Sequence, residues 1–295
     1  MDLAKSIKDN RPNISDNSVK TYCSLLNAFF YRHHDKTTPI SSKWFEDQDL
    51  LLDLLKDRPV STRKTLLAAL VSITKDNEKY KKAMMADGQI YKDFIDKQQK
   101  TKTQEENWKS FEEIQEIYNN MYNRVKPLLN GKIKLDARDI KLLQDFIILS
   151  LTTGVWMPPR RSTDWIEMHT SPEGIDKNTS NYIDKGFFVF NKYKTAKFYN
   201  EQRVEIPKGL KAILNKWVKI NPNKYLITGS NGDKITNVQL TQRLNQIFDG
   251  KISTSMLRHI FLSEKLKNVP ALRELQDLAH DMGHSIQEQI EYVKH

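Results

Sequence analysis

Two adjacent arginines that follow a pair of prolines are the first candidates for chemistry. Pro158 and Pro159 are expected to end the helix before them, so that Arg160 and Arg161 project from a fixed turn. Asp164 comes three residues after Arg161, a spacing at which its carboxylate can reach that guanidinium. A guanidinium held in this way presents a planar pair of donors to a phosphate. The segment predicts an anion-binding arginine, and an ordinary surface Arg–Asp pair is the alternative.

Another candidate arginine lies at the edge of an expected apolar helix face. Ser253 or Thr254 can cap a helix that continues through Ile260 and Phe261, and Arg258 then lies one turn inside it. A charge beside a core usually has a buried partner or a bound anion. The alternative is an arginine whose aliphatic stem packs on the core while its charged end reaches water.

A histidine and a tyrosine near the end of the chain could act at one place. Gly283 is expected to end a helix, and Ser285 with Glu288 forms a capping-box pattern that starts another. His284 then lies in a tight corner and Tyr292 on the helix that leaves it, so the two side chains can approach one site. The alternative for Tyr292 is a half-buried aromatic residue without a chemical role.

Lysines gather in a loop between two short β-prone runs, at residues 187–190 and 203–206. The runs predict a small hairpin. A lysine above a phosphate can give a proton to a leaving alkoxide, although loop lysines are more often only solvated. The loop, residues 191–202, carries Lys192, Lys194 and Lys197.

Metal ligands at diagnostic spacing are not found in the sequence. His280 and His284 are four residues apart, but Gly283 should break the helix between them and no third ligand stands at a suitable distance. Cys23 is the single cysteine, which excludes an intrachain disulfide and a cysteine-based metal site. We therefore expect no metal and no cofactor.

The elements that must position these residues are mostly helical. Apolar residues at helical spacing predict helices at residues 15–34, 47–56, 61–74 and 78–96, a small bundle. In the second half, a capping box at Ser110 and Glu113 starts a helix, and residues 136–152 predict a central buried helix. The expected fold class is mainly α with a small β-hairpin or sheet.

The chain is long enough for two domains, and a polar stretch suggests where they meet. Residues 97–107 contain no apolar side chain and predict a linker. We expect a helical domain at 1–100, a linker at 101–109 and a second domain at 110–295.

The charge of the chain and its hydropathy limit its partners and its location. The formal net charge is +10, the isoelectric point is about 9.3, and both halves are basic, which suits a polyanion such as DNA. The N-terminus has no apolar signal region, and no uncharged apolar run approaches the length of a membrane span. We expect an intracellular protein that does not cross a membrane.

The order of the motifs resembles the tyrosine recombinases of the phage lambda integrase family. It runs Arg-x-x-acid, a hairpin lysine, Leu-Arg-His, Gly-His-Ser and a tyrosine shortly afterwards. The resemblance covers the second half and implies that Arg161 and Arg258 clamp the scissile phosphate while Asp164 supports Arg161. It also implies that residues 1–100 are a core-binding domain that clamps the DNA duplex and residues 110–295 the catalytic domain.

The resemblance further implies that Tyr292 is the nucleophile, that Lys194 is the general acid for the 5′-hydroxyl and that His284 assists on the phosphate. The chain departs from the family at Ser255, where most members have a histidine that acts as a general base. The interval from His284 to Tyr292 is also one residue shorter than in many bacterial members. The motif sequences Pro-Pro-Arg-Arg-x-x-Asp and Met-Gly-His-Ser are somewhat similar to those of integrases from mobile elements associated with large eukaryotic DNA viruses.

The implied activity is site-specific recombination through a 3′-phosphotyrosine intermediate, without metal or ATP. The implied partner is double-stranded DNA, bound by a homo-tetramer on paired sites. Two alternatives remain: a type IB topoisomerase with the same catalytic residues, and a DNA-binding relative that has lost the chemistry.

Overall fold

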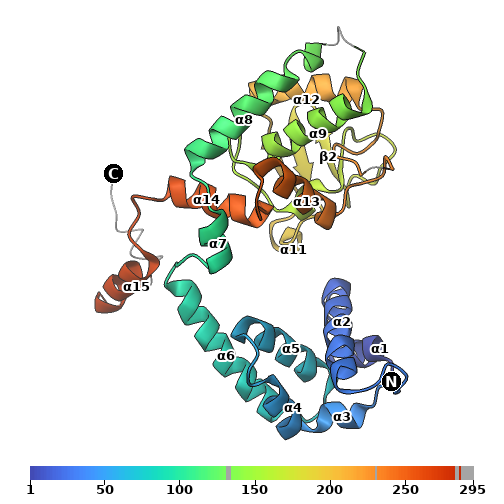
Figure 1. Ribbon diagram of the computed structural model, residues 1–295, viewed down its shortest axis with the longest axis vertical. Coiled ribbons are helices and arrows are strands. Elements are labelled where there is room, and N and C mark those ends of the chain that lie inside the picture. Colours follow the sequence, from blue (N-terminus) through green and yellow to red (C-terminus); the bar gives the residue numbers. More distant parts are fainter. Residues whose placement is uncertain (131–133, 230, 283–285, 287–295) are drawn as a thin grey trace. The chain divides into compact units, whose positions relative to one another are not determined.

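The computed structural model describes residues 1–130, 134–229, 231–282 and residue 286, and the chain folds into two compact units (Figure 1). Unit 1 contains Met1–Gln99 and the segment that begins at Pro270, and unit 2 contains Lys100–Val269. Helices dominate the described residues, and the strands found there form one four-stranded sheet, so the expected fold class is confirmed. None of the described helices combines the length and the apolar composition that a membrane crossing requires.

The described part of unit 1 is helical. Its helices are α1 (Leu3–Asn10), α2 (Asp16–His33), α3 (Ser42–Glu46), α4 (Gln48–Leu55), α5 (Val60–Ile73), α6 (Glu78–Asp96) and α15 (Leu272–Asp281). The four expected helices of the bundle are α2, α4, α5 and α6, each within a residue or so of its expected bounds. The short helices α1 and α3 were not expected, although Leu3 and Ile7 of α1 are buried.

The core of unit 1 joins α2, α4, α5 and α6. Phe29 and Phe30 of α2 pack with Leu51 and Leu67, all of them buried. Tyr80 of α6 is also buried and donates a hydrogen bond of 2.8 Å to the carbonyl oxygen of Phe45. Burial raises the pKa of the Tyr80 phenol, so it stays a neutral donor.

Unit 2 places its helices around a small sheet. The helices are α7 (Lys102–Asn107), α8 (Phe111–Val125), η1 (Leu128–Asn130), α9 (Ala137–Thr152), α10 (Ser162–Trp165), α11 (Ala196–Tyr199), α12 (Lys208–Ile220), α13 (Asn237–Phe248) and α14 (Thr254–Lys265). The strands are β1 (Met168–His169), β2 (Asn181–Asp184), β3 (Phe187–Phe190) and β4 (Gln202–Glu205). Their order is β1-β2-β3-β4, with β1 parallel to β2 and the other pairs antiparallel.

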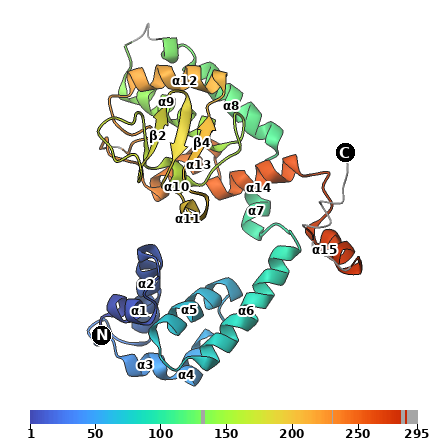
Figure 2. The same ribbon diagram turned by 180° about the vertical axis from the view of Figure 1, so that it is seen from behind.

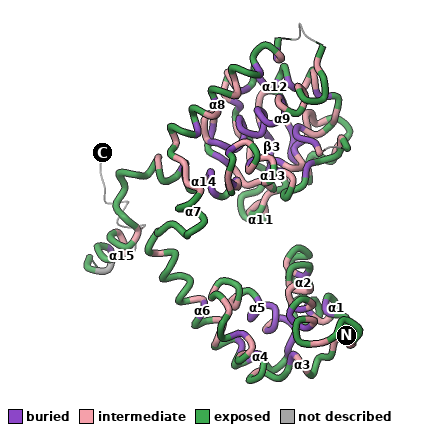
Figure 3. The backbone as a smooth tube through the Cα atoms, in the orientation of Figure 1, coloured by how far each residue is buried: buried purple, intermediate pink, exposed green. Residues whose placement is uncertain are grey.

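Helix α9 is the centre of unit 2, where the buried residues gather (Figure 3). It begins with a capping box between Asp136 and Asp139 and packs against α8, α12 and α13. Its buried Gln144 exchanges hydrogen bonds with Thr228, donating to the carbonyl oxygen at 2.8 Å and accepting from the amide nitrogen at 2.9 Å. Because the buried amide of Gln144 both donates and accepts a hydrogen bond, its burial is tolerated.

The segment that the sequence predicts as a linker, residues 101–109, contains α7. Thr101 and Gln104 form a capping box at the start of the helix. At its other end, the side-chain oxygen of Asn107 accepts a hydrogen bond of 2.6 Å from the backbone amide of Lys251. The polar side chains therefore cap and fasten a helix of unit 2.

Candidate functional site

The turn that carries the paired arginines begins at a glycine. Helix α9 ends at Thr152, six residues before Pro158, so the expectation that the prolines end this helix is wrong. Gly154 adopts φ +87°, which favours glycine, and a Cβ there would lie 2.4 Å from Phe261 of α14. The missing side chain thus allows α14 to approach the turn closely.

Arg160 is the most firmly held side chain of this turn. Its Nε donates to Asp164 Oδ2 at 2.9 Å, and its terminal nitrogen donates to Gln202 Oε1 at 2.9 Å. The guanidinium carbon lies 3.9 Å from the centroid of the Phe190 ring. Arg160 therefore links α10 to both β3 and β4, through an ion pair, a hydrogen bond and a cation–π contact.

The ion pair of Asp164 differs from the expected one. The sequence suggested that Asp164 holds Arg161, but the structure pairs its carboxylate with Arg160, four residues earlier. Arg161 has an extended backbone as the N-cap of α10, so the two arginines leave the turn differently. Asp164 is only 2% exposed, and a carboxylate that is so buried requires a charged partner.

Arg161 and Arg258 meet at one cavity of about 260 Å³. They come from the start of α10 and from the second turn of α14, nearly a hundred residues apart in the chain. Among the described residues, neither guanidinium has a hydrogen-bond or ion-pair partner, and both side chains are half-buried. The cavity is lined by Pro159, Arg160, Arg161, Asp164, Tyr193, Thr195, Tyr199, Gln202 and Arg258.

The electrostatics of this cavity favour an anion. Burial lowers the pKa of Arg258, and the nearby charge of Arg161 lowers it further, while Asp164 acts in the opposite direction. The cavity thus holds three guanidinium groups and one carboxylate, and that carboxylate is occupied by Arg160. A bound oxyanion would offset the repulsion between the guanidinium groups and accept hydrogen bonds from the free donors of Arg161 and Arg258.

The β3–β4 loop is fastened beside the cavity by a buried amide. Asn181 of β2 donates from Nδ2 to the carbonyl oxygens of Asp164 and Lys192, at 3.0 and 2.9 Å. Its Oδ1 accepts from the backbone amides of Asn191 and Lys192, at 2.9 and 2.7 Å. One side chain therefore joins α10 to the first residues of the lysine loop.

The three loop lysines have different surroundings. Lys192 forms an ion pair with Glu167, which also pairs with Lys234. Burial alone raises the pKa of Glu167, but the two ammonium groups lower it below its ordinary value. Lys194 and Lys197 are exposed and have no ion-pair partner within the described part of the chain. Lys194 itself does not line the cavity, whereas its neighbours Tyr193 and Thr195 do.

Of the three remaining candidate residues, only Ser255 lies within the part of the chain that the structure describes. Ser255 is exposed on α14 and is not among the lining residues. His284 and Tyr292 lie outside the described residues. Figure 2 shows α10, α11 and the start of α14 at the same end of unit 2, which is where the cavity lies.

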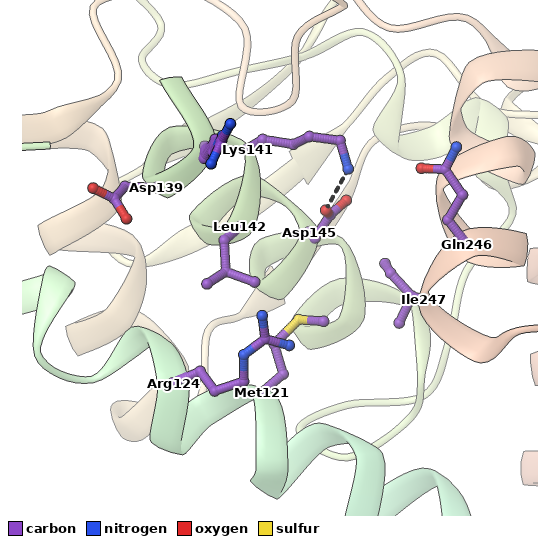
Figure 4. Close-up of a pocket in the computed structure, with 9 residues that line it drawn as sticks. Met121, Arg124, Asp139, Lys141, Leu142, Asp145, Gln246 and Ile247 are labelled. Carbon is purple, nitrogen blue, oxygen red and sulfur yellow. Dashed lines mark hydrogen bonds and ion pairs between the residues drawn. The ribbon is translucent and has the colours of Figure 1, made fainter. Parts of the chain in front are cut away.

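A second cavity of about 420 Å³ lies elsewhere in unit 2 and holds none of the candidate residues (Figure 4). Lys141 forms an ion pair with Asp145, one turn further along α9, and Arg243 forms an ion pair with the same carboxylate. Its apolar lining includes Met121, Leu142 and Ile247. Because its lining carries two carboxylates, those of Asp139 and Asp145, its charge suits a phosphate less well than that of the first cavity.

Two residues that build the site, Arg160 and Asn181, were not predicted from the sequence to do so. Arg160 was visible as a neighbour of Arg161, but nothing in the sequence showed which arginine would take the carboxylate. Asn181 gave no signal, because its partners are backbone groups 10 to 17 residues away, and any exposed loop asparagine has the same appearance in sequence.

Comparisons with known proteins give structural similarity without sequence similarity. No family model matches the chain, and no curated protein matches it significantly. Two crystal structures of a lambda integrase dimer bound to a COC′ core site are similar to it, each at 15% identity. One has a TM-score of 0.49 and covers 99% of this chain and 97% of that chain; the other has a TM-score of 0.47 and covers 96% and 73%. The crystal structure of XerA recombinase is similar with a TM-score of 0.31 and 11% identity, and covers 100% of this chain and 94% of that chain.

Proposed function

We propose that this chain is a site-specific tyrosine recombinase that breaks and rejoins DNA through a covalent link to Tyr292. The observation that carries the proposal is the pair of half-buried guanidinium groups, Arg161 and Arg258, which share a cavity and have no described partner. A phosphodiester has the charge and the oxygen geometry to satisfy both. The motifs of the sequence supply the nucleophile and the proton donor.

The proposed reaction is a transfer of the phosphoryl group between oxygens. The Tyr292 phenol releases its proton to solvent as its oxygen attacks the phosphorus of the scissile phosphodiester. A new P–O bond forms, and the bond between the phosphorus and the 5′-oxygen breaks. Lys194 gives the leaving oxygen its proton, and His284 assists on the phosphate. The guanidinium groups of Arg161 and Arg258 stabilise the charge that develops on the non-bridging oxygens. A 5′-hydroxyl from another strand then reverses the step, without metal or ATP.

The loop geometry favours Lys194 over Lys192 as the proton donor. The ammonium of Lys192 is occupied by Glu167, and moving it to a substrate would leave that carboxylate with one partner fewer. Lys194 is free among the described residues and is flanked by two residues that line the cavity.

The proposed partner is double-stranded DNA, and the proposed assembly is a homo-tetramer on paired sites. The net charge of +10 suits a polyanion, because each neutralised phosphate releases counterions. We further propose that the protein acts inside the cell, where its target DNA lies. We also propose that it is encoded by a mobile element, of the kind associated with large eukaryotic DNA viruses.

Covalent capture tests the proposal. The protein is incubated in EDTA with nicked duplexes. Cleavage near the nick releases a short strand that can no longer be rejoined, so the covalent adduct accumulates. The modified peptide is then mapped by mass spectrometry. We expect an adduct on Tyr292 that the Tyr292→Phe variant cannot form, while that variant still binds DNA. An adduct that survives in Tyr292→Phe means that another residue is the nucleophile. Binding without any adduct indicates the decayed relative, and rapid relaxation of supercoiled DNA of arbitrary sequence indicates the topoisomerase.

The two free arginines have their own prediction. Arg161→Ala and Arg258→Ala should each lower the rate of adduct formation by roughly 10²- to 10³-fold, the loss typical of one removed donor to a developing oxyanion. Arg138→Ala, an exposed arginine of α9 in the same unit, serves as the control and should leave the rate nearly unchanged. Equal rates in all three variants would contradict the assignment of the cavity.

A further inference from the structure

The short helix α11 presents two aromatic side chains to solvent at the edge of the candidate cavity. Phe198 is 80% exposed, the largest exposed fraction among the large apolar side chains of the described residues, and Tyr199 is 66% exposed. Tyr199 also lines the cavity that holds Arg161 and Arg258. Single exposed apolar residues are common, so exposure alone assigns no role. What distinguishes these two aromatic residues is their position beside the cavity that holds Arg161 and Arg258.

The loop that carries Phe198 and Tyr199 is held by hydrogen bonds. The Tyr193 hydroxyl donates to the carbonyl oxygen of Asn200 at 2.6 Å, and the backbone amide of Asn200 donates to the carbonyl oxygen of Ala196 at 2.9 Å. Asn200 adopts φ +54°, a backbone conformation that residues other than glycine rarely take. The fold therefore maintains an unfavourable backbone angle in a loop that displays an aromatic pair.

The charges around the pair identify what it can contact. Lys194 and Lys197 are exposed in the same loop and lack ion-pair partners within the described residues. Lysines beside an exposed aromatic ring suit a nucleic acid, in which phosphates alternate with flat bases. They do not suit an apolar partner, because docking such a partner would desolvate the two ammonium groups.

We propose that Phe198 stacks on a nucleobase of the nucleotide next to the phosphate held by Arg161 and Arg258. Consecutive residues are about 3.8 Å apart, so a ring one residue from the cavity wall is within reach of a neighbouring nucleotide. Stacking on a base in a duplex requires local unpairing, which costs least at a mismatch. The inference rests on the proposed function for its DNA substrate, but it requires no cleavage.

Photochemical cross-linking tests the contact without a known target sequence. Duplexes in which thymines are replaced by 5-iodouracil are bound to the full chain, irradiated and digested, and the modified peptides are mapped. We expect adducts on Phe198 or Tyr199, and Tyr292→Phe should cross-link equally because stacking precedes the chemistry. Adducts confined to other aromatic residues would overturn the proposal.

Binding measurements test how much the stacking of Phe198 contributes to DNA affinity. Wild-type protein should bind a duplex with a two-base mismatch roughly five- to a hundredfold more tightly than the matched duplex, the range expected for one stacked base. Phe198→Ala should lose this preference while its affinity for the paired duplex stays within about twofold, since the lysines and arginines provide that affinity. Phe198→Tyr should keep the preference. The control, Val238→Ala, removes an apolar side chain with 66% exposure from α13 and should behave as wild type.

The outcomes separate this inference from the proposed function. If no covalent adduct forms at Tyr292 but the cross-links and the mismatch preference are found, the stacking contact stands and the recombinase proposal fails. If the adduct forms and Phe198→Ala retains the full mismatch preference, the stacking contact is wrong. A Phe198→Ala variant that changes the sedimentation of the DNA-free protein would also overturn it, by indicating a contact between copies of the chain.

Discussion

At the scale of single residues, two lysines of the same loop motif differ in whether their ammonium groups are paired. Lys192 is fixed by Glu167, and that carboxylate is shared with Lys234. Lys194, two positions later, is exposed and unpaired among the described residues. A proton donor must be free to approach the leaving oxygen, so the difference in pairing bears directly on the assignment.

A leaving group that needs no proton distinguishes the two lysines. Lys194→Ala should slow cleavage of an ordinary substrate by roughly 10²- to 10⁴-fold, the usual contribution of a general acid. With sulfur in place of the bridging 5′-oxygen, the leaving thiolate needs no proton, and the rate of Lys194→Ala should return to nearly that of wild type. The rates are measured from single-turnover adduct formation.

Lys192→Ala is the matched control for this experiment. It should slow both substrates equally or leave both unchanged, since it removes an ion pair on the surface and no proton donor. Selective rescue of Lys192→Ala by the sulfur substrate would move the assignment from Lys194 to Lys192.

The residues of the site could be predicted from sequence only as far as their types and order. The motifs indicated Arg161, Asp164 and Arg258, and the structure places these three at one cavity. They could not indicate that Asp164 would bind Arg160, because both arginines stand within helical reach of the carboxylate and the choice depends on Phe190 and Gln202. Those two residues come from strands that the sequence places 26 and 38 positions away from Asp164.

At the scale of elements, the amide of Asn181 joins α10, β2 and the start of the β3–β4 loop through four hydrogen bonds. It is 1% exposed, so water cannot replace any of these bonds when the amide is lost. This one side chain therefore contributes directly to the position of the lysine loop beside the cavity.

Asn181→Ala should lower the free energy of unfolding by about 1–3 kcal/mol or more, because it leaves buried backbone groups without partners. It should also make the loop more sensitive to trypsin, which cuts after lysine. Asn237→Ala, an exposed asparagine of α13, is the control. Denaturant titration gives the stability, and timed digestion gives the loop sensitivity. A normal stability with unchanged digestion would show that the loop is held by other contacts.

The elements show why helices were easier to predict than strands. The helices α2, α5 and α6 have apolar residues at regular spacing, and their expected bounds differ from the observed ones by a residue or two. Strands β3 and β4 were expected as a hairpin, and β4 begins one residue earlier than predicted. The two-residue strand β1 depends on pairing with β2, which lies more than ten residues further along the chain, and so leaves no periodicity to read.

At the scale of the whole molecule, the hydrophobic cores of the two units share no residue. One contains Phe29, Leu67 and Leu70, and the other contains Phe146, Leu149 and Trp217. Separate cores allow separate cooperative unfolding.

Calorimetry should show two thermal transitions that respond to different mutations. Leu67→Ala should move one transition and Leu149→Ala the other, each through a loss of about 2–5 kcal/mol, because both side chains are fully buried. Leu50→Ala, at a side chain with 43% exposure, should move neither. A single transition that shifts with both core mutations would show that the units unfold together.

The composition of the cavity has a consequence for how the protein would respond to acid and base. Every cation that lines it among the described residues is an arginine, and a guanidinium keeps its proton throughout the range in which proteins stay folded, even where burial lowers the pKa as it does for Arg258. The grip on a phosphate should thus be nearly constant from mildly acidic to mildly alkaline solution. Any bell or slope in a profile of rate against pH would then report the chemical step and the groups that exchange protons in it, separated by the fold from the groups that hold the substrate.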